Sequence, residues 1–156
     1  MKKGDSILAS QLSGDFVLPR DASKKLAFIA GGIGVTPFRS MIKYMSDTHD
    51  MRAATLFYAG RSVDDLMYMD VFEDARQKIG VDTVYTVDAT GVVPTSWDGR
   101  VGRIDAAMIR EVMPDYKERL FYISGSYMLV SGMKKVLQEL GITSANIKVD
   151  YFPGII

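Results

Sequence analysis

Three glycines in the first third of the chain stand where a phosphate group could reach the backbone. Gly31, Gly32 and Gly34 follow a short apolar run and precede a helical pattern of apolar residues. Glycine has no side chain to block a ligand, and it adopts backbone angles that other residues rarely reach. Thr36 can cap the helix that follows, and Pro37 suits its first position. Because amides at a helix start attract anions, the segment predicts a diphosphate site.

The composition excludes several other kinds of chemistry. The chain has 156 residues, enough for one domain, and its 19 basic residues balance 19 acidic ones. Without a basic excess, nucleic acid is not an expected partner. The absence of cysteine excludes disulfides, thiolate metal sites and iron–sulfur centres. The single histidine, His49, lies in a polar run typical of a surface loop, so we expect no metal site.

The pattern after residue 25 alternates between strand and helix. Gly80 and Gly141 stand where helices commonly end. The expected strands cover residues 26–30, 53–59, 82–88, 120–124 and 146–150. The expected helices cover residues 37–46, 66–79, 106–113 and 127–140.

Five strands separated by helices predict an α/β fold with three layers, in which helices cover both faces of a five-stranded parallel sheet. Right-handed crossovers place the carboxyl ends of the strands along one edge. Rossmann-like sheets of this kind bind ligands at that edge. The glycine segment, Arg61, Asp88 and Ser124 all lie at the ends of expected strands, so we expect one shared site.

The first 24 residues do not follow this alternation. Residues 3–8 and 14–19 are typical of two short β-segments joined by a turn. We interpret residues 1–24 as the tail of a preceding β-domain, or as a short β extension of the sheet. Residues 25–156 then form the nucleotide-binding domain.

Four segments, taken in order, resemble those of one known family. They are residues 30–37 (AGGIGVTP), 57–61 (FYAGR), 97–104 (WDGRVGRI) and 124–128 (SGSYM), and the ending 150–154 (DYFPG) is also similar. The chain thus resembles the nicotinamide-nucleotide domain of the ferredoxin–NADP reductase superfamily. Members of this superfamily include flavodoxin reductases, cytochrome b5 reductases and the reductase components of oxygenases.

The resemblance implies where a nicotinamide cofactor binds. The implied cofactor-binding residues are Gly31, Gly32, Ile33, Gly34, Val35, Thr36, Pro37, Arg61, Asp88, Gly125, Ser126, Met128 and Phe152. Several of these residues could instead have a purely structural role. The glycines could serve only a tight turn, Arg61 could be a solvated surface side chain, and Met128 could belong to the core.

The resemblance also places Asp88 beside the adenosine ribose. A carboxylate there can accept hydrogen bonds from both ribose hydroxyls and would repel a 2′-phosphate. Relatives that prefer NADP tend to carry serine and arginine at this point, whereas this chain has Asp88 followed by Ala89. We therefore expect NADH to be preferred over NADPH. The alternative is an aspartate that only starts the loop 88–94.

Ser124 is the expected catalytic residue. By resemblance it replaces the cysteine of a Cys-Gly-Pro motif that lies beside the reactive nicotinamide carbon. Ser126 replaces the proline of that motif and can instead cap the next helix. Phe152 resembles the aromatic residue that covers the flavin ring in these reductases, although packing at a domain interface is an equally good interpretation.

A reductase of this family also needs a flavin domain, and nothing in this chain resembles one. About 20 residues cannot form a β-barrel, so we expect FAD or FMN to be held by a domain absent from this sequence. The expected partners are that domain and a redox acceptor. No membrane span or signal peptide is visible, which favours a cytoplasmic protein or the cytosolic part of an anchored one.

Other nucleotide enzymes fit less well. Classical Rossmann dehydrogenases and methyltransferases that use S-adenosylmethionine carry an acidic residue after the second strand, where this chain has Gly60 and Arg61. The glycine segment lacks the lysine of a P-loop. The alternative from another class is a module that binds nucleotide or transfers electrons without hydride exchange. The replacement at Ser124 and the missing barrel favour that alternative.

Overall fold

A computed structural model describes residues 6, 14–88 and 93–152 of the chain. It has the expected α/β architecture, with strands and helices alternating from residue 25 onward. The strands are β1 (Lys25–Gly31), β2 (Ala54–Gly60), β3 (Asp82–Val87), β4 (Arg100–Val101), β5 (Arg119–Ser126) and β6 (Ile147–Phe152). The main helices are α1 (Thr36–Asp47), α2 (Met69–Ile79), α3 (Ala106–Val112) and α4 (Tyr127–Glu139).

The sheet is parallel throughout and has six strands in the order β4-β3-β2-β1-β5-β6. The expectation of five strands is wrong by one. The additional strand, β4, has only two residues, which pair with Thr86 and Val87 of β3. Two residues are too few to show a hydrophobic periodicity, so the sequence could not predict this strand. It forms because it pairs with β3.

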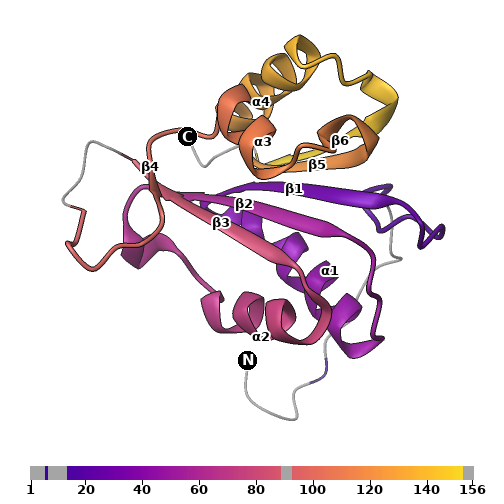
Figure 1. Ribbon diagram of the computed structural model, residues 1–156, viewed down its shortest axis with the longest axis horizontal. Coiled ribbons are helices and arrows are strands. Elements are labelled where there is room, and N and C mark those ends of the chain that lie inside the picture. The colour runs from indigo at the N-terminus through magenta and orange to yellow at the C-terminus, as the bar shows by residue number, and fades with distance from the viewer. Residues whose placement is uncertain (1–5, 7–13, 89–92, 153–156) are drawn as a thin grey trace.

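Helices cover both faces of the sheet (Figure 1). α1 and α2 pack on one face, around a core that includes Phe28, Tyr58 and Tyr122. α3 and α4 pack on the other face, around a core that includes Phe57 and Ile123. The two cores alternate along each central strand, as expected of a parallel sheet buried on both sides.

The helices begin and end close to the expected residues. Gly80 ends α2 in the left-handed region, with φ of 71°, and Gly141 follows α4 with φ of 82°. The start of α2 is the exception, because the expected helix begins at residue 66 and the observed one begins at Met69. Tyr68 has φ of 61°, which breaks the helical backbone just before that point.

The N-terminal segment is not a strand in the part that the structure describes. Residues 14–24 pair with no strand, contrary to the expected β-segment at 14–19, while the segment at 3–8 lies, apart from Ser6, outside the described residues. The segment is held by side chains instead. Phe16 packs edge-on against Tyr122 at 5.3 Å between ring centroids, and the Tyr122 hydroxyl donates to the Val17 carbonyl at 2.7 Å.

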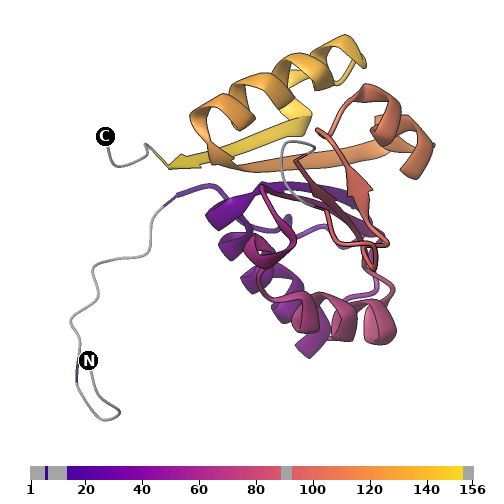
Figure 2. The same ribbon diagram turned by 90° about the vertical axis from the view of Figure 1, so that its left-hand side faces the viewer.

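These contacts hold the segment against the α/β domain, on the α1 side of the sheet. Arg52 donates to the carbonyl of Pro19 at 3.0 Å, and Lys148 donates to that of Asp15 at 3.2 Å. Figure 2 shows the chain entering along the sheet before β1 begins. In the part of the chain that is described, no helix has the length and apolar character needed to cross a membrane.

Candidate functional site

The carboxyl ends of the strands bring most of the expected site residues to one edge. Gly31 at the end of β1 lies opposite Ala59 of β2, and Gly60 lies opposite Val87 of β3. On the other side of β1, Ala30 lies opposite Ser124 of β5. Since parallel strands present their carboxyl ends together, the glycine loop occupies the centre of this edge.

The glycine loop leads into its helix through a short 3-10 turn, η1 (Gly32–Val35). Thr36 does not cap α1, contrary to expectation: it is the first residue of the helix, and its hydroxyl donates to the Ile33 carbonyl at 3.0 Å. Pro37 lies in the first turn of α1, as expected. No side chain caps η1 either, so the first amides of this continuous helical start are those available to an anion.

The three glycines of the loop have different surroundings. A Cβ at Gly32 would meet nothing within 4 Å, and its φ of 53° is in the left-handed region. A Cβ at Gly34 would lie 2.2 Å from the Ser124 carbonyl oxygen. The side chain missing at Gly34 therefore makes room for β5 and not, as expected, for a phosphate. Of these two glycines, only Gly32 has free space at the position that a side chain would occupy.

Gly31 and Gly125 leave room for the Leu129 side chain at the ends of the paired strands β1 and β5. A Cβ at either residue would come within 2.9 Å of the Leu129 side chain, and Gly125 has φ of 156°. Leu129 belongs to the first turn of α4, whose N-cap residue is Ser126. The Ser126 hydroxyl accepts from the Leu129 amide at 3.3 Å, which confirms the expected helix cap.

Ser124 is fully buried at the end of β5. Its hydroxyl has no hydrogen-bond partner among the described residues. An unpaired buried hydroxyl is costly, so this oxygen is suited to a partner from outside the protein. Met128 has the opposite environment: its side chain is 82% exposed, which rules out the core role considered as its alternative.

A cavity of about 400 Å³ opens beside the glycine loop on the α3 and α4 face. Gly60, Asp88, Arg103 and Ile104 line it from the strand ends, and Met128 and Leu129 line it from α4. Leu129 also packs beside Gly31, and Ala59, which is paired with Gly31, lines the cavity as well. Mostly apolar walls with a few charged groups are typical of a small-molecule site.

Asp88 and Arg61 differ in their relation to this cavity. Asp88 lines it, and its amide donates to the Gly60 carbonyl at 3.2 Å, which ties the ends of β2 and β3 together. The Asp88 carboxylate has four lone-pair positions, so it can accept hydrogen bonds from a ligand and from the protein at the same time. Arg61 is exposed and is not among the residues that line the cavity.

The loop after β2 explains the position of Arg61. A capping box between Ser62 and Asp65 closes the short helix η2 (Val63–Asp65). The buried Tyr58 hydroxyl donates to the Asp65 carbonyl at 3.2 Å and accepts from the Met67 amide at 3.1 Å. Burial raises the pKa of Tyr58, so the hydroxyl keeps its proton to a more alkaline pH than that of an exposed tyrosine. Gly60 lines the cavity, and residues 61–65 of this loop do not.

Sequence reasoning missed several residues that line the cavity. Gly60, Gly102, Arg103 and Ile104 lie there, although the last three enter the sequence argument only as part of a family segment. The Gly-Arg turn at residues 102–103 lies within the family segment 97–104, but no local signal distinguishes the residues of that segment that line the cavity. The short β4 that positions this turn gave no separate signal.

The C-terminal aromatic residues lie at the end of β5 and β6. Ser126 lies opposite Phe152 in the sheet, and Phe152 is 40% exposed. Tyr151 packs edge-on against Tyr127 at 5.9 Å between ring centroids. The expected glycine at 154 lies outside the described residues. An exposed aromatic pair at the site edge is able to cover a flat ligand or a neighbouring domain.

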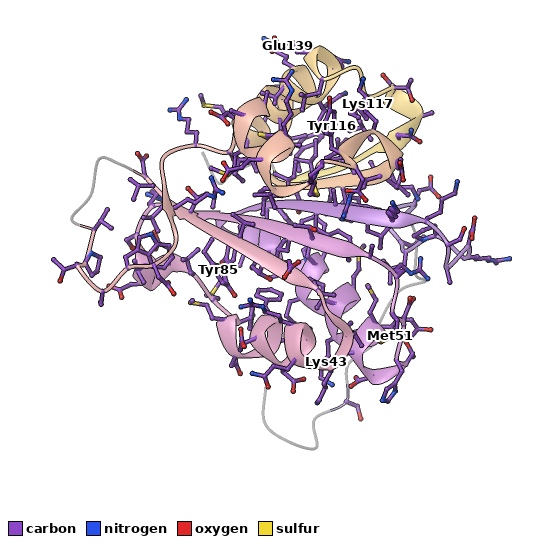
Figure 3. The ribbon with its side chains drawn as sticks, viewed as in Figure 1. Lys43, Met51, Tyr85, Tyr116, Lys117 and Glu139 are labelled. Carbon is purple, nitrogen blue, oxygen red and sulfur yellow. The ribbon has the colours of Figure 1, made fainter. Side chains whose placement is uncertain are left out.

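A second cavity, of about 380 Å³, lies on the opposite face between α2 and β3. Tyr85, labelled in Figure 3, extends from β3 toward α2 and lines this cavity with Glu73 and Arg76. Burial raises the pKa of Tyr85 to about 12. None of the expected site residues lies there. In the described part of the chain no group of three or more metal-ligating side chains is found.

The residues at the carboxyl edge fit a dinucleotide. The start of η1 offers amides and an open glycine to a diphosphate, and the neighbouring cavity offers apolar walls and a carboxylate to a nucleoside. The unpaired Ser124 hydroxyl lies on the other side of the loop. The candidate binding residues therefore extend along this edge of the sheet from β5, past β1, to β3.

Comparison with known sequences agrees with this geometry. Residues 28–135 match the family model described as oxidoreductase NAD-binding domain. The chain is 27% identical over 158 residues to a component of the Na⁺-translocating NADH-quinone reductase of Neisseria gonorrhoeae, and 26% identical to the corresponding component in Klebsiella pneumoniae. In both cases the alignment covers 99% of this chain and 39% of the relative.

Solved structures share the fold. The FAD/NAD-binding domain of nitric oxide dioxygenase from Vibrio cholerae has a TM-score of 0.76 and 19% identity, covering 90% of this chain and 55% of that one. The Amycolatopsis cytochrome P450 reductase GcoB also has a TM-score of 0.76, with 20% identity, covering 96% of this chain and 46% of that one.

Proposed function

Because the chain belongs to the oxidoreductase NAD-binding domain family, we propose that it is the nicotinamide-nucleotide half of a flavin-dependent reductase. It passes hydride from NADH to FAD or FMN, from which electrons go on to an acceptor. The observation that carries the proposal is that the uncapped helical start at Gly32–Val35 and the 400 Å³ cavity lie at the same edge of the sheet, since Gly31 is paired with Ala59, which lines the cavity. One bound molecule can reach both.

The diphosphate lies against the amides at the start of η1. Gly32 leaves the approach open, and Ile33, which is 59% exposed, borders it. The helix dipole of η1 and α1 favours the negative charge at this end. Gly34 supports this geometry indirectly, because it lets η1 pack directly on the backbone of β5.

The adenosine half enters the cavity on the α4 side. Its base packs against apolar side chains such as Leu129 and Ile104, and Asp88 accepts hydrogen bonds from the ribose hydroxyls. A carboxylate at this point repels a 2′-phosphate, which makes NADH the preferred cofactor. The Asp88 amide bond to Gly60 holds the carboxylate at the strand ends.

The nicotinamide half lies toward β5 and β6. When bound, the nicotinamide supplies the hydride chemistry, and the protein supplies orientation. The Ser124 hydroxyl, which has no partner among the described residues, donates to the ring amide. Phe152 shields the flavin side of the site when nicotinamide is absent. No side chain has to act as a general base, because hydride transfer releases no proton at the ring.

The rest of the reductase comes from outside this chain. The chain spans 39% of the length of the curated relatives that it matches. We assign the flavin to a separate domain, joined in the same protein or docked from another. The acceptor is a redox protein or a small molecule, and the domain works on the cytoplasmic side, alone or attached to a membrane-anchored protein.

Anaerobic flavin reduction tests the proposal. The chain is fused to, or mixed with, its flavin domain, and flavin absorbance is followed after NADH is added under nitrogen. The proposal predicts bleaching by NADH that depends on this chain. Mixtures that lack the chain are the control, and the absence of bleaching with both NADH and NADPH would contradict hydride transfer.

One alternative retains support from a specific observation. Serine stands at position 124, where the family motif has cysteine, which favours a module that binds nucleotide without turnover. Calorimetry separates the two: NADH binding without flavin bleaching would favour the binding module. Binding followed by bleaching would favour the reductase.

A further inference from the structure

The outer edge of β3 is only partly covered by another strand. On its inner side, β3 pairs with β2 from Asp82 to Val87. On its outer side, within the described residues, it pairs with β4 only at Thr86 and Val87 (Figure 1). Residues 82–85 therefore have a described strand neighbour on one side alone. An open strand edge of this kind offers amides and carbonyls to another extended chain.

The backbone of Thr83 is directed toward this open edge. The Asp88 amide donates inward to the Gly60 carbonyl of β2, and the Val87 carbonyl accepts from the Gly102 amide on the outer side. Backbone groups alternate between the two sides of a strand, so Thr83 directs its amide and carbonyl to the same side as Val87. At about 3.3 Å per residue, the open stretch of edge is about 13 Å long, which matches an extended segment of about four residues.

The cavity between α2 and β3 lies alongside this edge. Its volume is about 380 Å³, and Thr83, Val84 and Tyr85 line it from β3. Met69 and Phe72 of α2 give it apolar walls. A segment that pairs with the edge can therefore place one of its side chains in the cavity.

The two arginines that line this cavity are both offset by carboxylates. Arg100 binds Glu111 through two nitrogens at 2.8 and 2.6 Å. Arg76 lies 3.9 Å from a carboxylate oxygen of Glu73 and 3.9 Å from one of Asp82. Neither arginine therefore gives the cavity a net positive charge.

The carboxylates, in contrast, are not all offset by cations. Asp98 lines the cavity, and the ion pairs within the described part of the chain do not include it. Burial, and after it the negative charges of Glu73 and Asp70, raises the pKa of Tyr85 to about 12. The charges that act on the Tyr85 hydroxyl are thus negative. The cavity favours a cation on both grounds.

We propose that the outer edge of β3 binds an extended segment of a partner protein, which places a lysine or arginine side chain in the cavity between α2 and β3. The cationic group is attracted by Glu73 and Asp98, and its methylene stem packs on Phe72. No residue that lines this cavity lines the one beside the glycine loop. The inference is therefore independent of the proposed function.

Synthetic peptides test this inference on the full chain. The probe is acetyl-Thr-Val-Lys-Val-Thr-amide, compared with the same peptide carrying glutamate in place of lysine, and with one N-methylated at its three central residues. Nuclear magnetic resonance titration of the isotope-labelled chain measures the affinity and locates the site. We expect the lysine peptide to bind at least about tenfold more tightly than either comparison peptide, and to shift the amides of Thr83 and Tyr85.

Asp98→Asn should weaken binding of the lysine peptide about threefold, because it removes one of the attracting charges. Asp64→Asn is the matched control, because Asp64 is an exposed aspartate outside this cavity, and it should change nothing. The inference is overturned if the lysine peptide does not bind, if lysine and glutamate peptides bind equally, or if N-methylation leaves the affinity unchanged. Shifted amides that lie outside β3 and α2, or equal losses in the two variants, also overturn it.

Discussion

At the carboxyl edge of the sheet, some residues are needed for packing and others are available for binding. Gly34 and Gly32 are two positions apart, yet a Cβ would clash with the β5 backbone at the first and enter open space at the second. The sequence could not separate these roles, because glycine is needed for both. The structure separates them by what surrounds each position, which makes Gly32 the residue to test for ligand binding.

Changing the charge at Gly32 should affect NADH without affecting the fold. Asp and Asn tolerate a positive φ better than other residues and have the same shape. We expect Gly32→Asp to weaken NADH binding about tenfold or more relative to Gly32→Asn, because the carboxylate repels the diphosphate at the helix start. Calorimetry measures this difference, and equal affinities of the two variants would argue against a diphosphate at the loop.

Asp88 should control the choice between NADH and NADPH. Asp88→Asn keeps the shape and removes the charge, so repulsion of a 2′-phosphate is lost. We expect the ratio of NADPH to NADH affinity to rise about tenfold. Titration with both nucleotides measures it. Tighter binding of NADPH than of NADH by the unaltered chain would already contradict the role given to Asp88.

Elements with strong periodicity could be predicted from the sequence, and elements formed by tertiary contacts could not. The strand around Phe28 and the helix face containing Phe38 are as expected, because an uninterrupted apolar run and an apolar spacing of three and four are local signals. β4 and the N-terminal segment depend on distant partners. Phe16 uses its side chain to fill space under α1, so the apolar pattern around it wrongly suggests a strand.

The contact between η1 and β5 should be critical for stability. Gly34→Ala places a methyl group 2.2 Å from a backbone oxygen, and backbone cannot move aside as a side chain can. We expect a loss of about 2 to 4 kcal/mol in the free energy of unfolding. Urea denaturation measures it, with Gly132→Ala on open α4 surface as the control. A loss at Gly34 no larger than that at Gly132 would contradict the packing.

The Tyr122 hydroxyl should make stability sensitive to alkaline pH. Burial raises the pKa of Tyr122 to about 12, above its value of about 10 in the unfolded chain. The unfolded state therefore loses its proton first, and stability falls as pH rises from about 10 to about 12. Tyr122→Phe should lower stability at neutral pH by about 1 kcal/mol and make the alkaline decline less steep.

Urea denaturation at about pH 8 and about pH 11 provides this comparison. Tyr85 also has a pKa raised to about 12, so part of the decline remains in the Tyr122→Phe variant. An alkaline decline of the same size in both proteins would show that the Tyr122 hydroxyl does not couple to folding.

At the scale of the whole molecule, the family match confirms the resemblance that the ordered motifs indicated, over residues 28–135. The motifs lie at β1, β2, β4 and β5 in family order, and their sequence resemblance is why they could be found without a structure. Arg103 could not be assigned in this way, because its place in the site depends on β4 pairing with β3. The interpretation of residues 1–24 as the tail of a flavin domain stays a prediction.

A crystal structure of the full chain with NADH tests the central claim most directly. We predict diphosphate oxygens within hydrogen-bond distance of the amides at the start of η1, with the adenosine ribose beside Asp88 and the adenine against Leu129. A structure in which NADH binds elsewhere, or in which the amides of Gly32 and Ile33 face no phosphate oxygen, would contradict it.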